Sequence, residues 1–154
     1  VMNNLEKFLY LFGISMVPLI ELRGAMIYAA ANDMPFLQSF ICCVLGNILP
    51  VPFLIKFSKG ILLRLAKVNK IGWVFQKIID RGNKKAAEIG GWELLGLFLF
   101  VAIPLPGTGA WTASLVSALL QLRIKKCLLA IGAGVIACGL IMGALSFGIA
   151  NIIA

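Results

Sequence analysis

The sequence predicts an all-α integral membrane protein whose two halves have inverted topology. Three observations favour this class. The chain of 154 residues is 61% hydrophobic and only 13% charged, whereas a soluble domain carries about 25% charged residues. Two apolar stretches are each interrupted by prolines, glycines and polar residues, and the basic residues gather in two stretches around the second interruption. We therefore expect one membrane domain over residues 1–154, in which each half combines a re-entrant helical hairpin with one transmembrane helix.

The first half covers residues 1–55. Its apolar residues are divided at Val17–Ala25, a segment that contains a proline, a glutamate, an arginine and a glycine. Neither apolar part reaches the roughly 20 residues that a spanning helix needs. We expect residues 8–31 to form a hairpin that enters the membrane and returns. The following uncharged stretch predicts a span over 36–55, kinked in its second half by two prolines.

A basic amphipathic region over residues 56–90 joins the halves. Lys56–Lys85 holds nine of the fourteen basic residues and a single acid, Asp80. Its basic and large apolar residues recur at helical spacing on different faces, a pattern typical of helices that lie in the membrane surface. Anionic lipid headgroups are the expected partner of Lys56–Lys85, and nucleic acid is not expected. An ordinary lysine-rich cytoplasmic loop is the alternative.

The second half covers residues 91–154. Its apolar stretch is interrupted at Pro104–Thr112, with the sequence PLPGTGAWT. Two prolines and two glycines within nine residues cannot continue a helix. Irregular backbone at membrane depth persists only where it is buried in protein or lines a water-filled cavity. We expect a second re-entrant hairpin over 92–122 with this segment as its tip, followed by a span over 127–153.

The positive charges predict the orientation in the cell membrane. Lys56–Lys85 and Arg123–Lys126 are expected on the cytoplasmic side, because cytoplasmic loops carry an excess of Lys and Arg. Both ends of the second hairpin then lie inside, and the connector Asn32–Asp33 of the first hairpin lies outside. The hairpins therefore enter from opposite faces, as in transporters with inverted repeats. A homodimer is an expected way to enclose a path between the halves.

Glu21 and Arg23 are the only charged residues of the first apolar stretch, 8–31. Ionisable side chains inside a membrane usually line a cavity or face one another. In extended backbone, residues i and i+2 point the same way, so at a hairpin tip the pair is expected to act jointly. Arg23 suits a phosphate or another anionic headgroup. Burial favours protonated Glu21 and Arg23 favours the charged form, so Glu21 is a candidate carrier of a coupling proton. The alternative is a shallow hairpin from which both side chains reach water.

The second tip offers hydroxyls, backbone amides and an indole in place of charges. Helix N-termini at this tip are expected to meet an anion. Ser114 and Ser117 follow the tip and are expected to donate to the carbonyl oxygens four residues earlier. The candidate substrate-binding and ion-binding residues of the two tips are Pro18, Glu21, Arg23, Gly24, Pro104, Pro106, Gly107, Thr108, Gly109, Trp111 and Thr112.

Neither a metal site, nor a cofactor, nor an enzymatic activity is expected. The chain has no histidine, and its four cysteines lie in or beside apolar segments without the spacing of metal ligands. No nucleophile stands at a recognisable spacing from a base. We expect the cysteines to be small apolar residues of the core.

Two motifs carry a family resemblance. PLIELRGA, beginning at Pro18, and PLPGTGAWTASLVSALL, beginning at Pro104, together resemble the small multidrug export proteins of bacteria and archaea. That family is similar in layout to the DedA/VTT superfamily, and Glu21 matches the acidic residue of that superfamily's first hairpin. The resemblance implies movement of lipids, including polyprenyl-phosphate carriers, and proton-dependent tolerance to toxic compounds. The arginines that the superfamily places around its second hairpin are absent from Pro104–Thr112.

Two functions stay open from the sequence. The first is a membrane transporter that exports or translocates an amphipathic or lipid-like substrate, such as a lipid phosphate, with proton coupling through Glu21. The second is a non-transporting membrane module or a holin-like channel former, assembled through a Gly-x-x-x-Gly pattern that begins at Gly139. Flux that depends on Glu21 distinguishes the first from the second.

Overall fold

The computed structural model describes residues 3–68, 70–87 and 91–153. Within these ranges the chain forms eight helices and no strands. The helices are α1 (Asn4–Met16), α2 (Glu21–Ala31), α3 (Phe36–Ile48), α4 (Val51–Leu65), α5 (Gly72–Ala87), α6 (Trp92–Ala102), α7 (Ala110–Leu119) and α8 (Ile124–Ile153).

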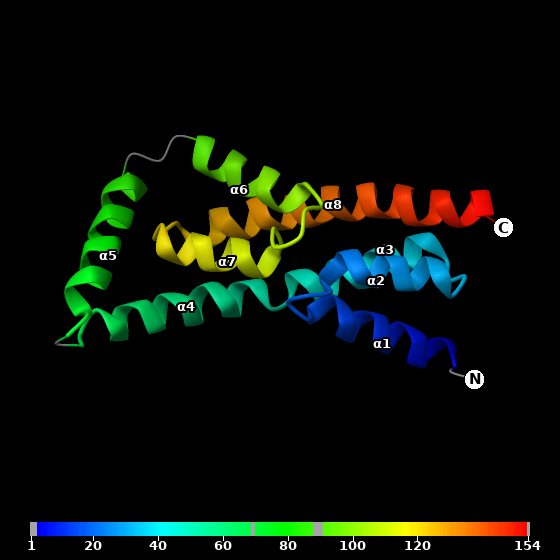
Figure 1. Cartoon of the computed structure of the whole chain (residues 1–154), viewed down its shortest axis with the longest axis horizontal. Coiled ribbons are helices and arrows are strands. Elements are labelled where there is room, and N and C mark those ends of the chain that lie inside the picture. Colours follow the sequence, from blue (N-terminus) through cyan, green and yellow to red (C-terminus); the bar gives the residue numbers. More distant parts are fainter. Residues whose placement is uncertain (1–2, 69, 88–90, 154) are drawn as a thin grey trace.

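Two long apolar rods run along the molecule in opposite directions (Figure 1). The first is α3 continued by α4, with 30 residues from Phe36 to Leu65, and the second is α8, of which Ile124–Ile149 is long and apolar enough to cross a membrane. At 1.5 Å per residue, each exceeds the roughly 30 Å of a hydrocarbon core. The first rod is interrupted at Leu49 and Pro50, because proline has no N–H for the helix ladder.

The first rod continues past residue 55, the predicted end of the span. Ile55 and Leu62 of α4 are buried against the bundle, whereas Lys56 between them is exposed. The basic residues of this stretch therefore occupy the outer face of the helix without ending it. The helix thus runs on into the basic region, and the residue at which the span ends stays a prediction.

Two pairs of short helices lie beside the rods. α1 and α2 run from the end of the molecule that holds the N-terminus to its middle and back, and α6 and α7 do the same from the opposite end (Figure 1). These helices have between 10 and 13 residues, so none is long enough to cross a membrane alone. The irregular tips, 17–20 and 103–109, meet midway along the molecule.

Each pair packs against both rods. The first helix of a pair lies against the rod of its own half: α1 contacts α3, and α6 contacts α8. The second helix also reaches the rod of the other half: α2 contacts α8, and α7 contacts α4. This exchange joins the two halves into one bundle and holds both tips between the rods.

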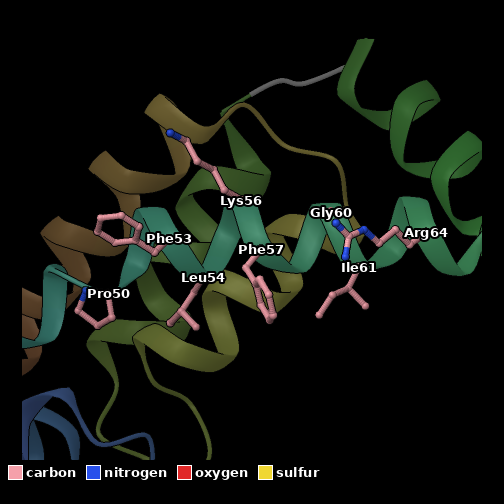
Figure 2. A pocket seen from close by; sticks show the side chains of 8 residues that line it. All are labelled: Pro50, Phe53, Leu54, Lys56, Phe57, Gly60, Ile61 and Arg64. Atoms are coloured by element: carbon pink, nitrogen blue, oxygen red, sulfur yellow. The ribbon is translucent and has the colours of Figure 1, made fainter.

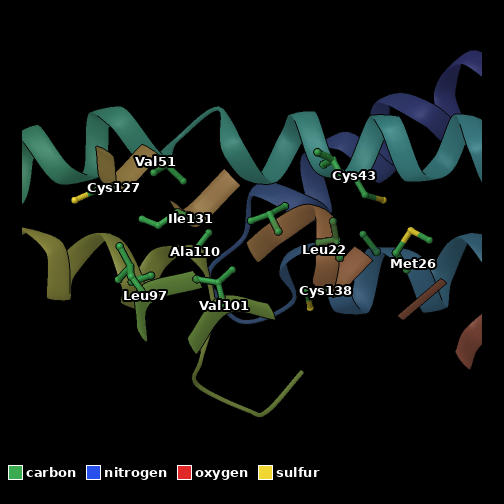
Figure 3. Packing of buried hydrophobic residues seen from close by; sticks show 14 of the residues in the cluster. Leu22, Met26, Cys43, Val51, Leu97, Val101, Ala110, Cys127, Ile131 and Cys138 are labelled. Carbon is green, nitrogen blue, oxygen red and sulfur yellow. The ribbon is translucent and has the colours of Figure 1, made fainter. Parts of the chain in front are cut away.

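The core between the rods is apolar and closely packed. Figure 3 shows Leu22 of α2, Val51 of α4 and Ile131 of α8 among the side chains that fill it. Small residues allow the closest approaches. A Cβ atom at Gly46 of α3 would overlap the hydroxyl of Ser15 of α1.

The glycine pair of α8 is covered within the chain. A Cβ at Gly139 would overlap Phe40, and a Cβ at Gly143 would overlap Phe36, both from α3. The close contact that a Gly-x-x-x-Gly pattern permits is therefore made inside the bundle. The channel-forming alternative requires several chains to assemble through this pattern. Its two glycines are already covered by α3 of the same chain.

The outer surface of the bundle is also apolar. Leu19, Leu129 and Phe53 are 95%, 75% and 70% exposed, and large apolar side chains are exposed on all of α1 to α8. A protein that is surrounded by water rarely leaves such extensive apolar surface uncovered. The apolar helices and this surface together indicate a membrane location.

The basic stretches gather at one end of the molecule. α5 lies across this end, beside the turn between α7 and α8 (Figure 1). Ile79 of α5 is buried, and a Cβ at Gly82 would lie 2.9 Å from Gln121 Cγ and 3.0 Å from the carbonyl oxygen of Leu119. The apolar face of α5 therefore packs partly on the bundle. Arg123–Lys126 lies at the same end, and Asn32–Asp33 lies at the other end; which end faces the cytoplasm stays a prediction.

Candidate functional site

The tips of the two helix pairs bound a cavity of about 830 Å³ in the middle of the molecule. Its walls are formed by Pro18, Leu19, Ile20, Glu21, Arg23, Gly24, Pro104, Pro106, Gly107, Gly109, Trp111, Thr112, Leu115 and Met142. Ten of the eleven residues that the sequence singled out lie in these walls, and the eleventh, Thr108, is a hydrogen-bond partner of Arg23. The structure thus brings all eleven together, and their role in binding a substrate stays a prediction.

Glu21 begins α2 in an unusual backbone conformation. Its φ is 49°, in the left-handed region that residues other than glycine rarely adopt. Its amide donates to the carbonyl oxygen of Val17 at 2.9 Å and so closes the turn at the first tip. Such a conformation costs on the order of 1–3 kcal/mol and is found preferentially at functional sites. The side chain is only 6% exposed.

The carboxylate of Glu21 lies at the N-terminus of α7. The backbone N–H of Trp111 donates to Glu21 Oε1 at 3.3 Å. A Cβ at Gly109 would overlap the carboxylate, so a larger residue at that position would displace the side chain of Glu21. Helix N-termini attract anions because their first N–H groups are unpaired. The anion that the sequence led us to expect at this helix N-terminus is the chain's own glutamate.

Arg23 engages the other side of the second tip. Its guanidinium donates to the carbonyl oxygens of Leu105 and Thr108, to that of Ile103 at 3.3 Å and to Thr108 Oγ1 at 3.1 Å. These carbonyls follow the end of α6, where no further helical turn supplies donors. A planar guanidinium with five N–H groups suits several carbonyl oxygens at once. Arg23 therefore adds charged donors to this tip, where the carbonyl oxygens of Ile103 and Leu105 also accept from Thr108 Oγ1.

Trp111 returns a contact to the first hairpin. Its indole Nε1–H donates to the carbonyl oxygen of Met16, the last residue of α1, at 2.9 Å. Side chains thus cross between the hairpins in both directions. The two tips are fixed to each other as well as to the rods.

The expectation of extended backbone at Glu21 and Arg23 is wrong. Both residues lie in the first turn of α2, where positions i and i+2 point apart. Glu21 accordingly reaches the N-terminus of α7, and Arg23 reaches the end of α6. The two side chains thus contact different parts of the second tip, and whether they share a ligand in the cavity that both line stays a prediction.

The serines after the second tip have the partners that the sequence predicts. Ser114 Oγ donates to the carbonyl oxygen of Ala110 at 2.6 Å, and Ser117 Oγ donates to that of Ala113 at 2.7 Å. Both hydroxyls are buried. They are bonded within α7, outside the walls of the cavity.

Sequence reasoning missed part of the apolar wall. Leu115 lies one helical turn after Trp111 and therefore on the same face of α7, a signal that was present in the sequence. Met142 comes from the distant α8, and nothing in its sequence neighbourhood marks it. Among the residues that the structure describes, no cluster of three or more His, Cys, Asp or Glu side chains could hold a metal ion.

A comparison with protein families bears on this site. The model of a family described as "Putative small multi-drug export protein" matches residues 21–141. The chain belongs to this family. The matched range begins at Glu21 and includes the whole second tip, and the family's name suggests a membrane protein of small multidrug export. No curated protein and no solved structure matches the chain.

Proposed function

We propose that this chain is a secondary transporter that exports amphipathic compounds through the cavity between the tips, with Glu21 as carrier of a coupling proton. One observation carries the proposal: a buried carboxylate in the wall of a cavity of about 830 Å³, halfway along a bundle of membrane length. An ionisable side chain at such a depth is costly, and in membrane proteins it usually marks a pathway for substrate, ion or proton. The family's name agrees with export.

We infer that α1–α2 and α6–α7 are re-entrant hairpins of an inverted repeat. In support, the order of a short helix pair followed by a long rod occurs twice along the chain, and the second copy runs in the opposite direction (Figure 1). An inverted repeat also accounts for the contact that the second helix of each pair makes with the rod of the other half. Transporters with inverted repeats hold their substrate where broken helices meet near the bilayer midplane.

The walls of the cavity favour an amphipathic substrate. Leu19, Leu115 and Met142 offer apolar contact, while Glu21 and Thr112 offer polar atoms. A compound with an apolar body and a basic group suits these walls. The carboxylate of Glu21 has few contacts with the protein, so a basic group of the substrate can pair with it. An electrically neutral or cationic drug-like compound is therefore our first candidate.

A lipid phosphate is the second candidate, and Arg23 in the same walls is the observation that favours it. The guanidinium is engaged with the carbonyl oxygens of the second tip. A phosphate must therefore replace these carbonyls before it can bind Arg23. Transport of a lipid phosphate then requires that the second tip move away from the first.

Protonation of Glu21 provides a physical basis for coupling. The N-terminus of α7 attracts the carboxylate while it is charged. A proton on Glu21 removes this attraction and one side of the contact between the tips. Binding of a proton and release of the tips are thereby linked, so a proton gradient can drive a change in access to the cavity.

The test is flux in liposomes that contain the purified protein. With an imposed pH gradient and ethidium as the amphipathic probe, the native chain is expected to move the dye, and Glu21→Gln to move it no faster than liposomes without protein. Glu6→Gln is the matched control, since Glu6 is exposed and only caps the start of α1. A second arm uses a fluorescent polyprenyl phosphate for the lipid candidate.

Unchanged, gradient-dependent flux in Glu21→Gln would contradict the proposed role of the carboxylate. Flux that needs no gradient and does not saturate would indicate a pore. Movement of the polyprenyl phosphate without movement of ethidium would favour the second candidate over the first.

A further inference from the structure

A groove on the outer face of α4 is separate from the cavity at the tips. It has a volume of about 570 Å³, and Figure 2 shows its side chains along one side of the helix. Phe53, Phe57 and Ile61 form its apolar surface, and the two phenylalanines are 70% and 69% exposed. Lys56 and Arg64 add positive charge to the same groove.

The groove has the length of one half of a bilayer. Its apolar part reaches from Pro50 to Ile61, which is roughly 16 Å at 1.5 Å per residue and half of the roughly 30 Å core, and Arg64 closes the groove beyond it. Arg64 lies about one turn beyond Ile61, at the basic end of the rod. A chain laid on the apolar surface would therefore run from the middle of the molecule to the level at which headgroups are expected.

The charge of this region calls for an external anion. Lys56–Lys85 contains nine basic residues and one acid, Asp80, so its own acids cannot neutralise it. Lys56 is exposed on a rod that is apolar for most of its length. A lysine there is costly unless its ammonium reaches the interface or an anionic group. The side chain of Arg64 runs back along the helix toward Gly60 (Figure 2).

Gly60 leaves the middle of the groove open. Apart from the adjoining residues and the backbone of its own helix, no atom of the described chain lies within 4 Å of the place where its Cβ would be. Packing inside the protein therefore does not require glycine at this position, although glycine weakens a helix by roughly 1 kcal/mol relative to alanine. The gap is available to a molecule from outside.

We propose that this groove binds one anionic phospholipid from the leaflet at the basic end. An acyl chain lies along Phe53, Phe57 and Ile61, and the phosphate is held by Arg64, while Lys56 adds positive charge along the groove. The phosphate supplies the negative charge that Lys56–Lys85 lacks. The apolar surface of the groove favours a lipid over a free anion. The site stands apart from the tip cavity, so it does not depend on the proposed transport.

Native mass spectrometry and thermal unfolding in detergent test the site, with phosphatidylglycerol and phosphatidylcholine added separately. The native chain is expected to retain one phosphatidylglycerol and to unfold at a higher temperature with it, and to do neither with phosphatidylcholine. Lys56→Gln/Arg64→Gln should lose both effects. Gly60→Leu should lose them as well, because its side chain fills the groove, while its unfolding without lipid stays near that of the native chain.

Arg123→Gln/Lys126→Gln is the matched control, because it removes the same charge from the same end outside the groove. It should keep the bound phosphatidylglycerol. An equal loss in this control would overturn the proposal in favour of diffuse attraction to the basic end. A change from dimer to monomer in Gly60→Leu would also overturn it, since the groove would then hold a second copy of the chain. Retention of phosphatidylglycerol by Gly60→Leu would show that the lipid binds elsewhere.

Discussion

The two tips share a layout but contribute different chemistry to the site. The first tip supplies side chains, Glu21 and Arg23, whereas the second supplies mostly backbone, namely carbonyl oxygens of 103–108 and the N–H of Trp111. Each also contains or adjoins a residue with positive φ, Glu21 at 49° and Gly107 at 84°. Glycine adopts this conformation readily and glutamate does not, so the strain is confined to the first tip.

This difference determines how each tip should respond to mutation. Glu21 and Arg23 of the first tip bind backbone groups of the second tip. This contact depends on where the backbone of the second tip lies, and not on which side chains that backbone carries. The first tip should therefore be sensitive to the loss of functional groups. The second tip should tolerate such losses better and should be sensitive to added bulk where its backbone approaches the first.

Replacing Arg23 should have the largest effect. Arg23→Met keeps most of the length of the side chain but removes the hydrogen bonds that the guanidinium donates to Ile103, Leu105 and Thr108. We expect a loss of about 3 kcal/mol in the free energy of unfolding, because several carbonyls lose a charged partner together. The stability of Arg23→Lys should lie between those of the native chain and Arg23→Met, because an ammonium cannot reproduce the planar fork of a guanidinium. Thermal unfolding in detergent measures both; near-native stability of Arg23→Met would mean that the second tip holds its shape alone.

Added bulk at the second tip should come next. Gly109→Ala places a methyl group against the carboxylate of Glu21, and overpacking of this kind costs about 2 kcal/mol. The control is Gly96→Ala, where a Cβ meets no atom within 4 Å and a slight gain in stability is expected. If the clash is with Glu21, the alanine should cost at least about 1 kcal/mol less in a Glu21→Ala background. Simple additivity of the two changes would contradict the close approach.

The hydrogen bond that Trp111 donates to Met16 should contribute less to stability. Trp111→Phe keeps the aromatic ring system in part and removes the donor to the Met16 carbonyl oxygen. A single hydrogen bond contributes about 1 kcal/mol, so we expect a loss of that order in the same unfolding assay. A loss as large as that of Arg23→Met would show that the indole, and not the guanidinium, holds the tips together.

The smallest effects are expected just beyond the second tip. Ser114→Ala and Ser117→Ala remove hydroxyls that donate only to carbonyl oxygens of their own helix. Each should change the free energy of unfolding by no more than about 0.5 kcal/mol and leave dye flux unchanged. A clear fall in flux with intact stability would instead place a hydroxyl in the substrate path.

The sequence was sufficient to locate the site but not to describe its contacts. Prolines, glycines and intramembrane charges are visible in composition, and they identified the residues that meet around the cavity. Apart from the hydroxyl of Thr108, the partners of Glu21 and Arg23 could not be found in this way, because they are backbone groups. The positive φ of Glu21 and the contribution of Met142 depend on how distant helices pack.

The central claim is that neither interrupted segment crosses the membrane. Single cysteines at Trp92, Arg123 and Asn32, in a chain whose four native cysteines are replaced, can be labelled in oriented vesicles with a maleimide that does not cross membranes. We predict that positions 92 and 123 react from one face and position 32 from the opposite face. Labelling of 92 and 123 from opposite faces would mean that α6 and α7 together traverse the bilayer, and would contradict the account.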